Sequence, residues 1–253
     1  MKMYIRAAAL SGLDEIAANH DHDIKQLLAR NRLAPSVFRN LDQEIAFQSL
    51  IALFEDCARS WQMPDLGLKL AKKHTLNNLG VVALVVRMEP TARAAVQAIL
   101  RNLFLHSNAY FGELVEPPGG HFAELRIDVR SNGQSARIFR EMLVFSVKML
   151  LEAIAGRPPK ILRATVPHGP LTGSETLSRK LGCEVQYHAR DCVVVFEPDI
   201  LDVKLQQTDI AFHPIIKRYL IDATAEKHGD FAVTVRRGVF RPVSLGSCFQ
   251  EQV

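Results

Sequence analysis

The chain has 253 residues, 48% of them hydrophobic and 23% charged, with a formal net charge of +4 at pH 7. This balance is typical of a globular protein with a substantial core, and no apolar run is long enough to span a membrane. The mild positive charge is compatible with nucleic acid as a partner but does not by itself indicate one.

The N-terminus and the cysteines both point to a cytoplasmic protein. An acidic pair, Asp14 and Glu15, follows a very short apolar run, which makes a poor secretory signal. The four cysteines form no CxxC pair and no tight cluster, so we expect reduced thiols and neither disulfides nor a zinc site. They are Cys57, Cys183, Cys192 and Cys248.

The first eighty residues predict helices. Residues 23–31 carry Leu27 and Leu28 at helical spacing, and residues 42–61 place most of their apolar side chains along one stripe. Residues 80–88 differ, because their continuous β-branched run is typical of a strand buried on both faces. Thr91 can then cap a helix with an alanine-rich apolar face.

The middle of the chain predicts a hairpin followed by a long buried helix. Two strand patterns, residues 109–116 and 121–129, flank the turn sequence Pro117–Gly120. Residues 136–155 are apolar on more than one face, so we place this helix deep in the core. Gly156 is expected to end it.

The last predicted elements are a strand over residues 160–168, a short helix ending at Gly182, and a hairpin over residues 184–198. Helices lie between some strands, and tight turns join others. This mixture predicts an α+β fold, with N-terminal helices followed by a mixed, largely antiparallel sheet that helices cover. Beyond it we expect a helix near Pro214 and a basic connecting segment.

Catalytic and metal-binding motifs are not evident. The sequence contains no GxSxG, SxxK, P-loop or GxGxxG pattern, which argues against the common nucleophile and phosphate-binding enzymes. Residues 20–23 read HDHD and offer metal-ligating atoms, but adjacent donors at a helix start diverge, so an exposed polar segment is favoured. We expect no metal, no cofactor and no enzymatic activity.

One face of the predicted sheet is polar and gives the candidate site. Glu124 and Arg126 alternate with apolar residues along their strand, and Arg163 and His188 can share their side. This face is either a solvated surface with cross-strand charge pairs or a recess in which Arg126 or Arg163 meets a small anionic ligand. We take Arg126, Arg163, Glu124 and His188 as candidate ligand-binding residues.

Several stretches resemble the N-terminal effector-binding region of one branch of AraC-type bacterial transcription regulators. They are IRAAALSGLDEIAANHDHDIKQLLARNRLAPSVF, FEDCARSWQMPDLGLKLAKK, LGVVALVVRMEPTARAAVQAILRNLFLHS and LGCEVQYHARDCVVVFEPDIL. The likeness runs from about Ile5 to Tyr219. The final GSCFQEQV resembles the first capped helix of the helix-turn-helix domain of such regulators, with Ser247 and Gln250 at capping-box spacing.

The resemblance implies an effector-binding and dimerisation domain over residues 1–205, with a helical part (1–79) and an α/β part (80–205). A linker helix and basic connector (206–246) and a truncated start of the DNA-binding domain (247–253) would follow. The implied partners are a small-molecule effector and a second copy in a homodimer, with DNA contacted only through the missing domain. By analogy, the dimer helices would be Ala92–Leu105 or Ile210–Ala225.

Two other functions stay open at this stage. An enzyme acting on a small acid would use Arg126, His121 or His168, and would require a titrating group whose substitution abolishes turnover. A ligand-free dimerisation module would show no saturable binding. The identity of the effector, and whether the regulator activates or represses, do not follow from the sequence.

Overall fold

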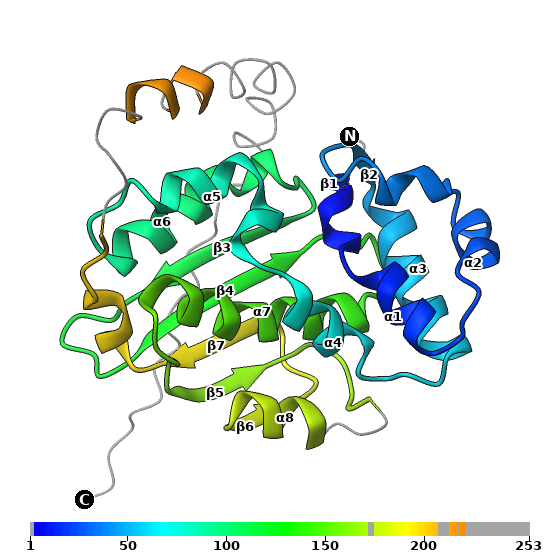
Figure 1. Ribbon diagram of the computed structural model, residues 1–253. Helices are drawn as coiled ribbons and strands as arrows, with labels where there is room; N and C mark the ends of the chain where they lie inside the picture. The colour runs from blue at the N-terminus through cyan, green and yellow to red at the C-terminus, as the bar shows by residue number, and fades with distance from the viewer. Residues whose placement is uncertain (1–2, 172–174, 207–212, 217, 221–253) are drawn as a thin grey trace, which may run out of the picture.

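The computed structural model describes residues 3–171, 175–206, 213–216 and 218–220. A helical N-terminal part packs beside a larger part built on a five-stranded sheet (Figure 1). The main elements of the N-terminal part are β1 (Tyr4–Arg6), α1 (Leu13–Asn19), α2 (Lys25–Arg30), β2 (Glu44–Ala46), α3 (Phe47–Ser60) and α4 (Leu66–Lys73). Short 3-10 helices η1 (Ala7–Leu10), η2 (Pro35–Phe38) and η3 (Leu76–Leu79) connect them.

The sheet has the order β3-β4-β7-β5-β6, in which only the β5–β6 pair is parallel. Its strands are β3 (Tyr110–Val115), β4 (Ala123–Val129), β5 (Ile161–Thr165), β6 (Glu184–Gln186) and β7 (Cys192–Phe196). The predicted α+β class and the mixed, largely antiparallel sheet are therefore confirmed.

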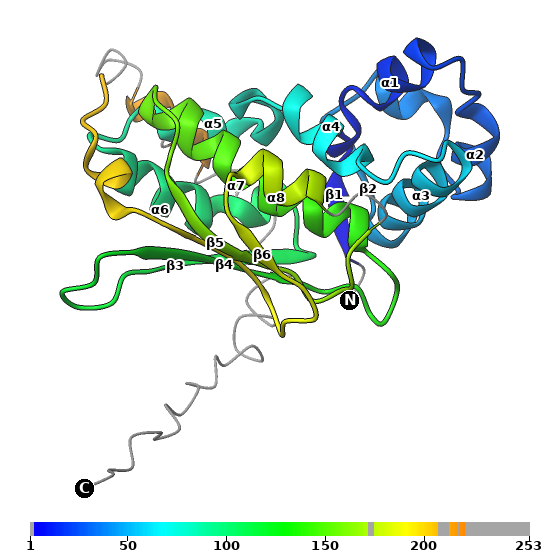
Figure 2. The same cartoon turned by 90° about the horizontal axis from the view of Figure 1, so that it is seen from below.

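Helices cover one face of this sheet and leave the other face without a helix among the described residues (Figure 2). They are α5 (Val81–Val86), α6 (Ala92–Asn102), α7 (Arg137–Ala155) and α8 (Glu175–Leu181). The 3-10 helix η4 (Leu103–Leu105) follows α6, and η5 (Pro198–Asp202) follows β7. The predicted caps are confirmed, because Thr91 Oγ1 accepts from the Ala94 amide at 3.2 Å and Gly156 ends α7 with φ 71°. None of the described helices combines the length and hydrophobicity that crossing a membrane requires.

The strand predicted over residues 80–88 is wrong, because Val81–Val86 forms helix α5. Gly80, with φ 62°, precedes the helix and redirects the chain into it. Val82 and Val86 are buried, whereas Leu84 keeps 41% of its surface exposed. A short apolar run fits either a buried strand or a helix, and here packing against α6 overrides the β propensity of valine.

The hairpin predicted over residues 184–198 is also wrong. Strand β6 pairs in parallel with β5, and β7 inserts between β4 and β5. Strand β7 is suited to the interior of the sheet, since Val194, Val195 and Phe196 are all buried. Strands β1 and β2, which pair with each other, were not predicted from the helical pattern of the first eighty residues.

Phe139 of α7 joins the helical part to the sheet. Its ring lies 5.0 Å from that of Phe47 on α3 and 5.7 Å from that of Tyr110 on β3, both in edge-to-face geometry. All three side chains are buried. The two parts therefore share one continuous core through α7.

The expected linker over residues 206–246 and the expected domain start over 247–253 lie almost entirely outside the described residues. Of this region, residues 213–216 and 218–220 are described and helical, where a helix near Pro214 was expected.

Candidate functional site

A cavity of about 420 Å³ lies on the helix-covered side of the sheet. The inward-facing residues Tyr110 and Gly112 of β3, and Leu125 and Ile127 of β4, form its floor. Inward-facing positions on these strands are apolar because the helices cover them, which is the alternation expected of a sheet with one buried face. The cavity thus lies where the sheet meets the helices.

Helix α7 forms a long wall of this cavity. Phe139 and Met142 are buried at the inner end, and Ser146 and Leu150 are half-buried further along the helix. Ala153, near the C-terminus of α7, is exposed and also lines the cavity, so the mouth lies at that end. The opposite wall consists of α6 residues such as Leu100, together with η1 and η3.

The cavity lining carries no formal charge. Among the described residues that line it, none is Asp, Glu, Lys or Arg. Its polar side chains are His74, Thr75, Asn77, Asn78, His106, Tyr110 and Ser146. A mostly apolar wall with a few polar groups is the usual construction of a small-molecule site.

His74, the C-cap residue of α4, is one of the lining residues and has an enclosed ring nitrogen. Its Nε2 atom is buried and has no hydrogen-bond partner among the described residues. Burial lowers the pKa of His74 to about 4, and a hydrogen bond with the Ser11 backbone opposes this shift only in part. The ring is therefore neutral at physiological pH.

Tyr110 and His106 lie together at the floor of the cavity. The two rings meet edge to face with centroids 6.3 Å apart. Burial raises the pKa of Tyr110, so its phenol stays protonated and remains able to donate a hydrogen bond. Both His74 and Tyr110 are consequently neutral groups of the lining.

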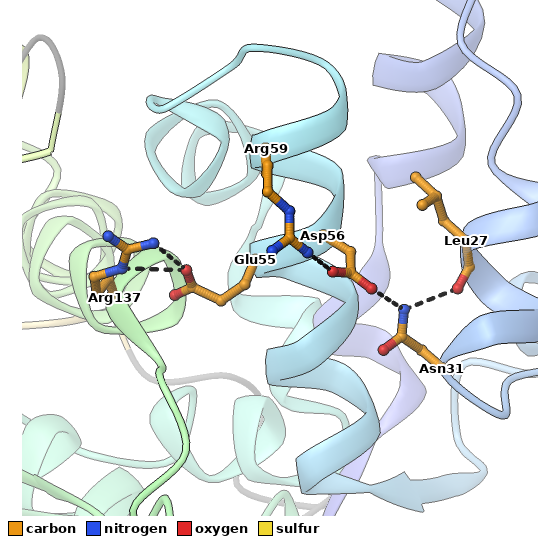
Figure 3. A network of polar contacts seen from close by, with 6 residues as sticks. All are labelled: Leu27, Asn31, Glu55, Asp56, Arg59 and Arg137. Atoms are coloured by element: carbon orange, nitrogen blue, oxygen red, sulfur yellow. Dashed lines mark hydrogen bonds and ion pairs between the residues drawn. The ribbon is translucent and has the colours of Figure 1, made fainter.

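A polar network fixes the start of α7 to the helical part of the chain (Figure 3). Glu55 on α3 accepts a hydrogen bond from Arg137 Nη2 at 2.8 Å and another from the Ile138 amide at 3.2 Å. The adjacent residue Asp56 pairs with Arg59 and accepts from Asn31 Nδ2 at 2.9 Å. A carboxylate at the first amides of a helix is favourable because of the helix dipole, so Glu55 anchors α7 at that end.

Glu141 is a buried carboxyl on α7, outside the cavity lining. Its Oε1 atom has no partner in the part of the chain that the structure describes. Burial raises the pKa of Glu141 to about 7; the nearby Arg137 opposes this shift, and the Glu55 carboxylate adds to it. The folded protein therefore binds this proton more tightly than the unfolded chain does.

We expect Glu141→Gln to change how stability depends on pH. In the unmodified chain the free energy of unfolding should fall as the pH rises from the ordinary pKa of 4.5 to about 7, because ionisation is opposed only in the folded state. The neutral glutamine removes this loss. The variant should match the parent at about pH 4 and exceed it by up to about 3 kcal/mol at about pH 8, measured by urea unfolding.

Glu113→Gln, on an exposed position of β3, is the matched control for this measurement and should stay within about 0.5 kcal/mol at both pH values. The lowered pKa of His74 makes the free energy of unfolding rise with pH over the same range. The parent and both variants contain His74, so its contribution cancels when they are compared. A Glu141→Gln difference that does not change with pH would contradict the assignment.

The four residues predicted for the site lie away from this cavity. Glu124 and Arg126 of β4 form an ion pair at 2.7 Å on the helix-free face, where the Arg126 side chain is 49% exposed. Arg163 on β5 lies on the same face, since Glu124 and Arg163 both pair with Val195 from opposite sides. His188 is exposed beyond the end of β6, at φ 56°. Ligand binding by these residues stays a prediction.

The other described histidines and the described cysteines lie outside the cavity lining. His121 is exposed between β3 and β4, and His168 is buried beside the Gly169 carbonyl, with Nδ1 at 2.8 Å from that oxygen. In the HDHD stretch, His22 stacks on Trp61 at 5.0 Å. Within the described residues, no group of three His, Cys, Asp or Glu side chains could hold a metal, and Cys57, Cys183 and Cys192 are free.

The cavity residues were missed from the sequence because an apolar lining has the same pattern as a core. One signal was present. Gly112 interrupts strand β3, and an interior glycine in a strand often marks a close approach. A Cβ atom at this position would lie 2.5 Å from Leu100 Cδ2 of α6, so the glycine lets the helix approach the sheet beside the cavity.

Comparisons with known proteins agree on the family. The arabinose-binding domain of AraC transcription regulators, at their N-terminus, matches residues 22–205. The HTH-type transcriptional regulator VirS of Mycobacterium tuberculosis, from two strains, is 30% identical over 264 residues, covering 98% of this chain and 74% of that protein.

Among solved structures, the transcriptional regulator CdpR from Pseudomonas aeruginosa is similar with a TM-score of 0.52 and 18% sequence identity. The match covers 74% of this chain and 57% of that one, so it spans little more than half of the length of that protein. At this identity the likeness supports the fold alone.

Proposed function

Because the chain belongs to the AraC-type transcription regulators through their N-terminal arabinose-binding domain, we propose that its cavity binds a small-molecule effector that controls DNA binding. The observation that carries this proposal is the cavity of about 420 Å³ between the sheet and α7. Ligand sites in proteins typically measure about 300–1,000 Å³ and combine an apolar wall with a few polar groups.

Helix α7 is the element through which binding would be transmitted. It lines the cavity with Met142, Ser146 and Leu150, and Glu55 holds its first turn to the helical part. A ligand that fits one position of α7 better than another shifts the population towards that position. A difference of about 1–3 kcal/mol between two such arrangements is typical of allosteric coupling.

We also propose that the regulator acts as a homodimer, with α6 as one candidate dimer helix. Helix α5 packs beside α6. Leu84 of α5 is exposed and is an apolar side chain available to a dimer contact. The other candidate segment, Ile210–Ala225, is described only in part. Sedimentation equilibrium of the chain measures the oligomeric state directly, and a monomer at all accessible concentrations would contradict the proposal.

A thermal-shift screen with a cavity-filling variant tests effector binding. The compounds are fatty alcohols, fatty acids, aromatic acids and amino acids. A compound that binds only the native state should stabilise it by about 2.7 kcal/mol at a hundredfold excess over Kd. Ser146→Trp places a large side chain in the cavity, so we expect it to abolish the ligand-induced rise in Tm.

Ser146→Ala is the matched control, because it removes the hydroxyl without filling the space, and it should keep the ligand-induced rise. A rise that survives Ser146→Trp would place the ligand elsewhere, and Arg126→Ala then tests the helix-free face of the sheet. No rise with any class of compound would contradict the sensor and favour a ligand-free dimerisation module.

A further inference from the structure

We propose that helix α6 transmits occupancy of the cavity to residues 203–205, which lead into the expected connector (206–246). A ligand that displaces the cavity end of α6 loosens the hydrogen bonds that hold these residues. This inference rests on the proposed function and names the route of its regulation. Helix α7 leads from the cavity to the helical part, and α6 leads from the cavity to the connector.

The first turn of α6 is hydrogen-bonded to the segment that follows η5. The Ala92 amide donates to the Val203 carbonyl at 2.9 Å, and the Leu205 amide donates to the Pro90 carbonyl at 3.0 Å. These two bonds, which we call the connector contact, flank an antiparallel β-bridge. The chain therefore leaves the sheet part of the molecule bound to the start of α6.

Arg93, also on the first turn of α6, reinforces the connector contact. Its Nη2 atom donates to Asp202 Oδ1 at 2.7 Å, at the end of η5, and its Nη1 atom pairs with Glu116, which follows β3. The backbone bonds and this ion pair act on neighbouring residues of the same segment. We therefore expect residues 202–205 to move together with the first turn of α6.

The other end of α6 forms part of the cavity wall. Ile99 and Leu100 line the cavity and lie about 10–12 Å along the helix axis from Ala92, at 1.5 Å per residue. Leu100 also packs against the floor, since a Cβ atom at Gly112 would be 2.5 Å from its Cδ2 atom. Protein interiors are close-packed and transmit strain, so a displacement at this end reaches the first turn of the helix.

The floor of the cavity is held more firmly than α6. Strand β3 pairs with β4 along its whole length, and β4 pairs in turn with β7, so the floor strands are fixed by backbone hydrogen bonds. Helix α6 has no such ladder with the sheet and approaches it through side chains such as Leu100. A ligand that enters between Leu100 and the floor is therefore expected to displace α6 and not β3.

Hydrogen exchange measured by NMR reports on the connector contact. The Ala92 and Leu205 amides exchange when this contact opens. The Val166 amide is the reference, because it donates to the Gln186 carbonyl at 3.0 Å, at the opposite edge of the sheet from β3. Dividing the first two rates by the Val166 rate separates local opening of the contact from a general loss of stability.

Gly112→Val tests the route on the chain without any ligand. Valine suits a strand, and its side chain meets Leu100, so it displaces the same wall that a ligand would displace. We expect both rate ratios to rise about tenfold. Glu113→Val, the matched control, places the same side chain at the next position of β3, which is exposed on the helix-free face, and should leave both ratios unchanged.

Arg93→Ala loosens the connector contact from its other side. It removes the ion pair with Asp202, so the rate ratio of the Leu205 amide should rise about threefold, as expected of a partly exposed ion pair. Arg101→Ala, at an exposed position on the last turn of α6, is the control and should have no effect. Because Gly112→Val opens the same contact, the double variant should show less than the product of the two single effects.

Two results would overturn the inference. Unchanged rate ratios in a folded Gly112→Val protein would show that the cavity end of α6 does not act on the connector contact. Effects of Gly112→Val and Arg93→Ala that simply multiply would show that the two ends of α6 act independently. If Gly112→Val does not fold, Gly112→Ala adds only the Cβ atom and takes its place, with Glu113→Ala as its control. Since these variants require no ligand, the route can fail while the thermal-shift screen still supports the sensor.

Discussion

Replacing Phe139 by alanine should lower the free energy of unfolding by about 3–5 kcal/mol. The ring is buried and packs edge to face on Phe47 of α3 and on Tyr110 of β3, so its removal leaves a void in both parts at once. Phe139 also lines the cavity, and the void would join it. Neighbouring side chains cannot collapse fully into an enlarged cavity, which places the cost towards the upper end of this range.

Urea unfolding of the chain measures this effect, with Phe111→Ala as the matched control. Phe111 lies half-buried on the helix-free face of the sheet, where its ring contacts the Arg130 guanidinium at 4.3 Å. Loss of that contact and of the partial burial should cost about 1 kcal/mol. If Phe139→Ala costs no more than Phe111→Ala, the two parts of the chain do not share one core.

The elements that the sequence predicted correctly are those with long, unambiguous local patterns. Helix α7 is long and apolar on several faces, and Gly156 ends it by adopting a left-handed conformation. The β3–β4 hairpin has alternating residues on both sides of Pro117–Gly120. In both cases the information lies within the element, so no knowledge of its neighbours is needed.

The failures concern elements whose structure depends on neighbours. The valine-rich run at 81–86 becomes a helix because it packs against α6 and η3. Strand β7 follows β6 in the chain but pairs with β4 and β5. Proximity in sequence therefore did not reveal which strands are its partners. Residue patterns give the burial of such elements but not their partners.

The site shows the same limit. Alternation along β4 correctly placed Glu124 and Arg126 on one face and Leu125 on the other, but it could not tell which face bordered a cavity. The cavity lies on the apolar side, where Leu125 and Ile127 have the pattern of core residues. Only the arrangement of helices shows that the space above them is not filled.

Gly67→Val should destabilise the chain by about 3 kcal/mol, through the contact between α4 and α7. Gly67 lies in α4, where an added Cβ atom would be 2.4 Å from the Ile138 carbonyl oxygen and 3.1 Å from the Met142 nitrogen. Both contacts are with the backbone of α7, which no change of rotamer can relieve. The helices must separate, and the cavity wall formed by Met142 must move with them.

Lys72→Val, at an exposed position of the same helix, is the matched control and should cost only about 0.5 kcal/mol from the helix propensity of valine. Urea unfolding of both variants gives the difference. Because α7 forms a wall of the cavity, a folded Gly67→Val protein should also lose ligand-induced stabilisation that Lys72→Val retains. Equal stability of the two variants would show that α7 can move away from α4 without cost. The α4–α7 contact would then be unable to transmit a change at the cavity to the helical part.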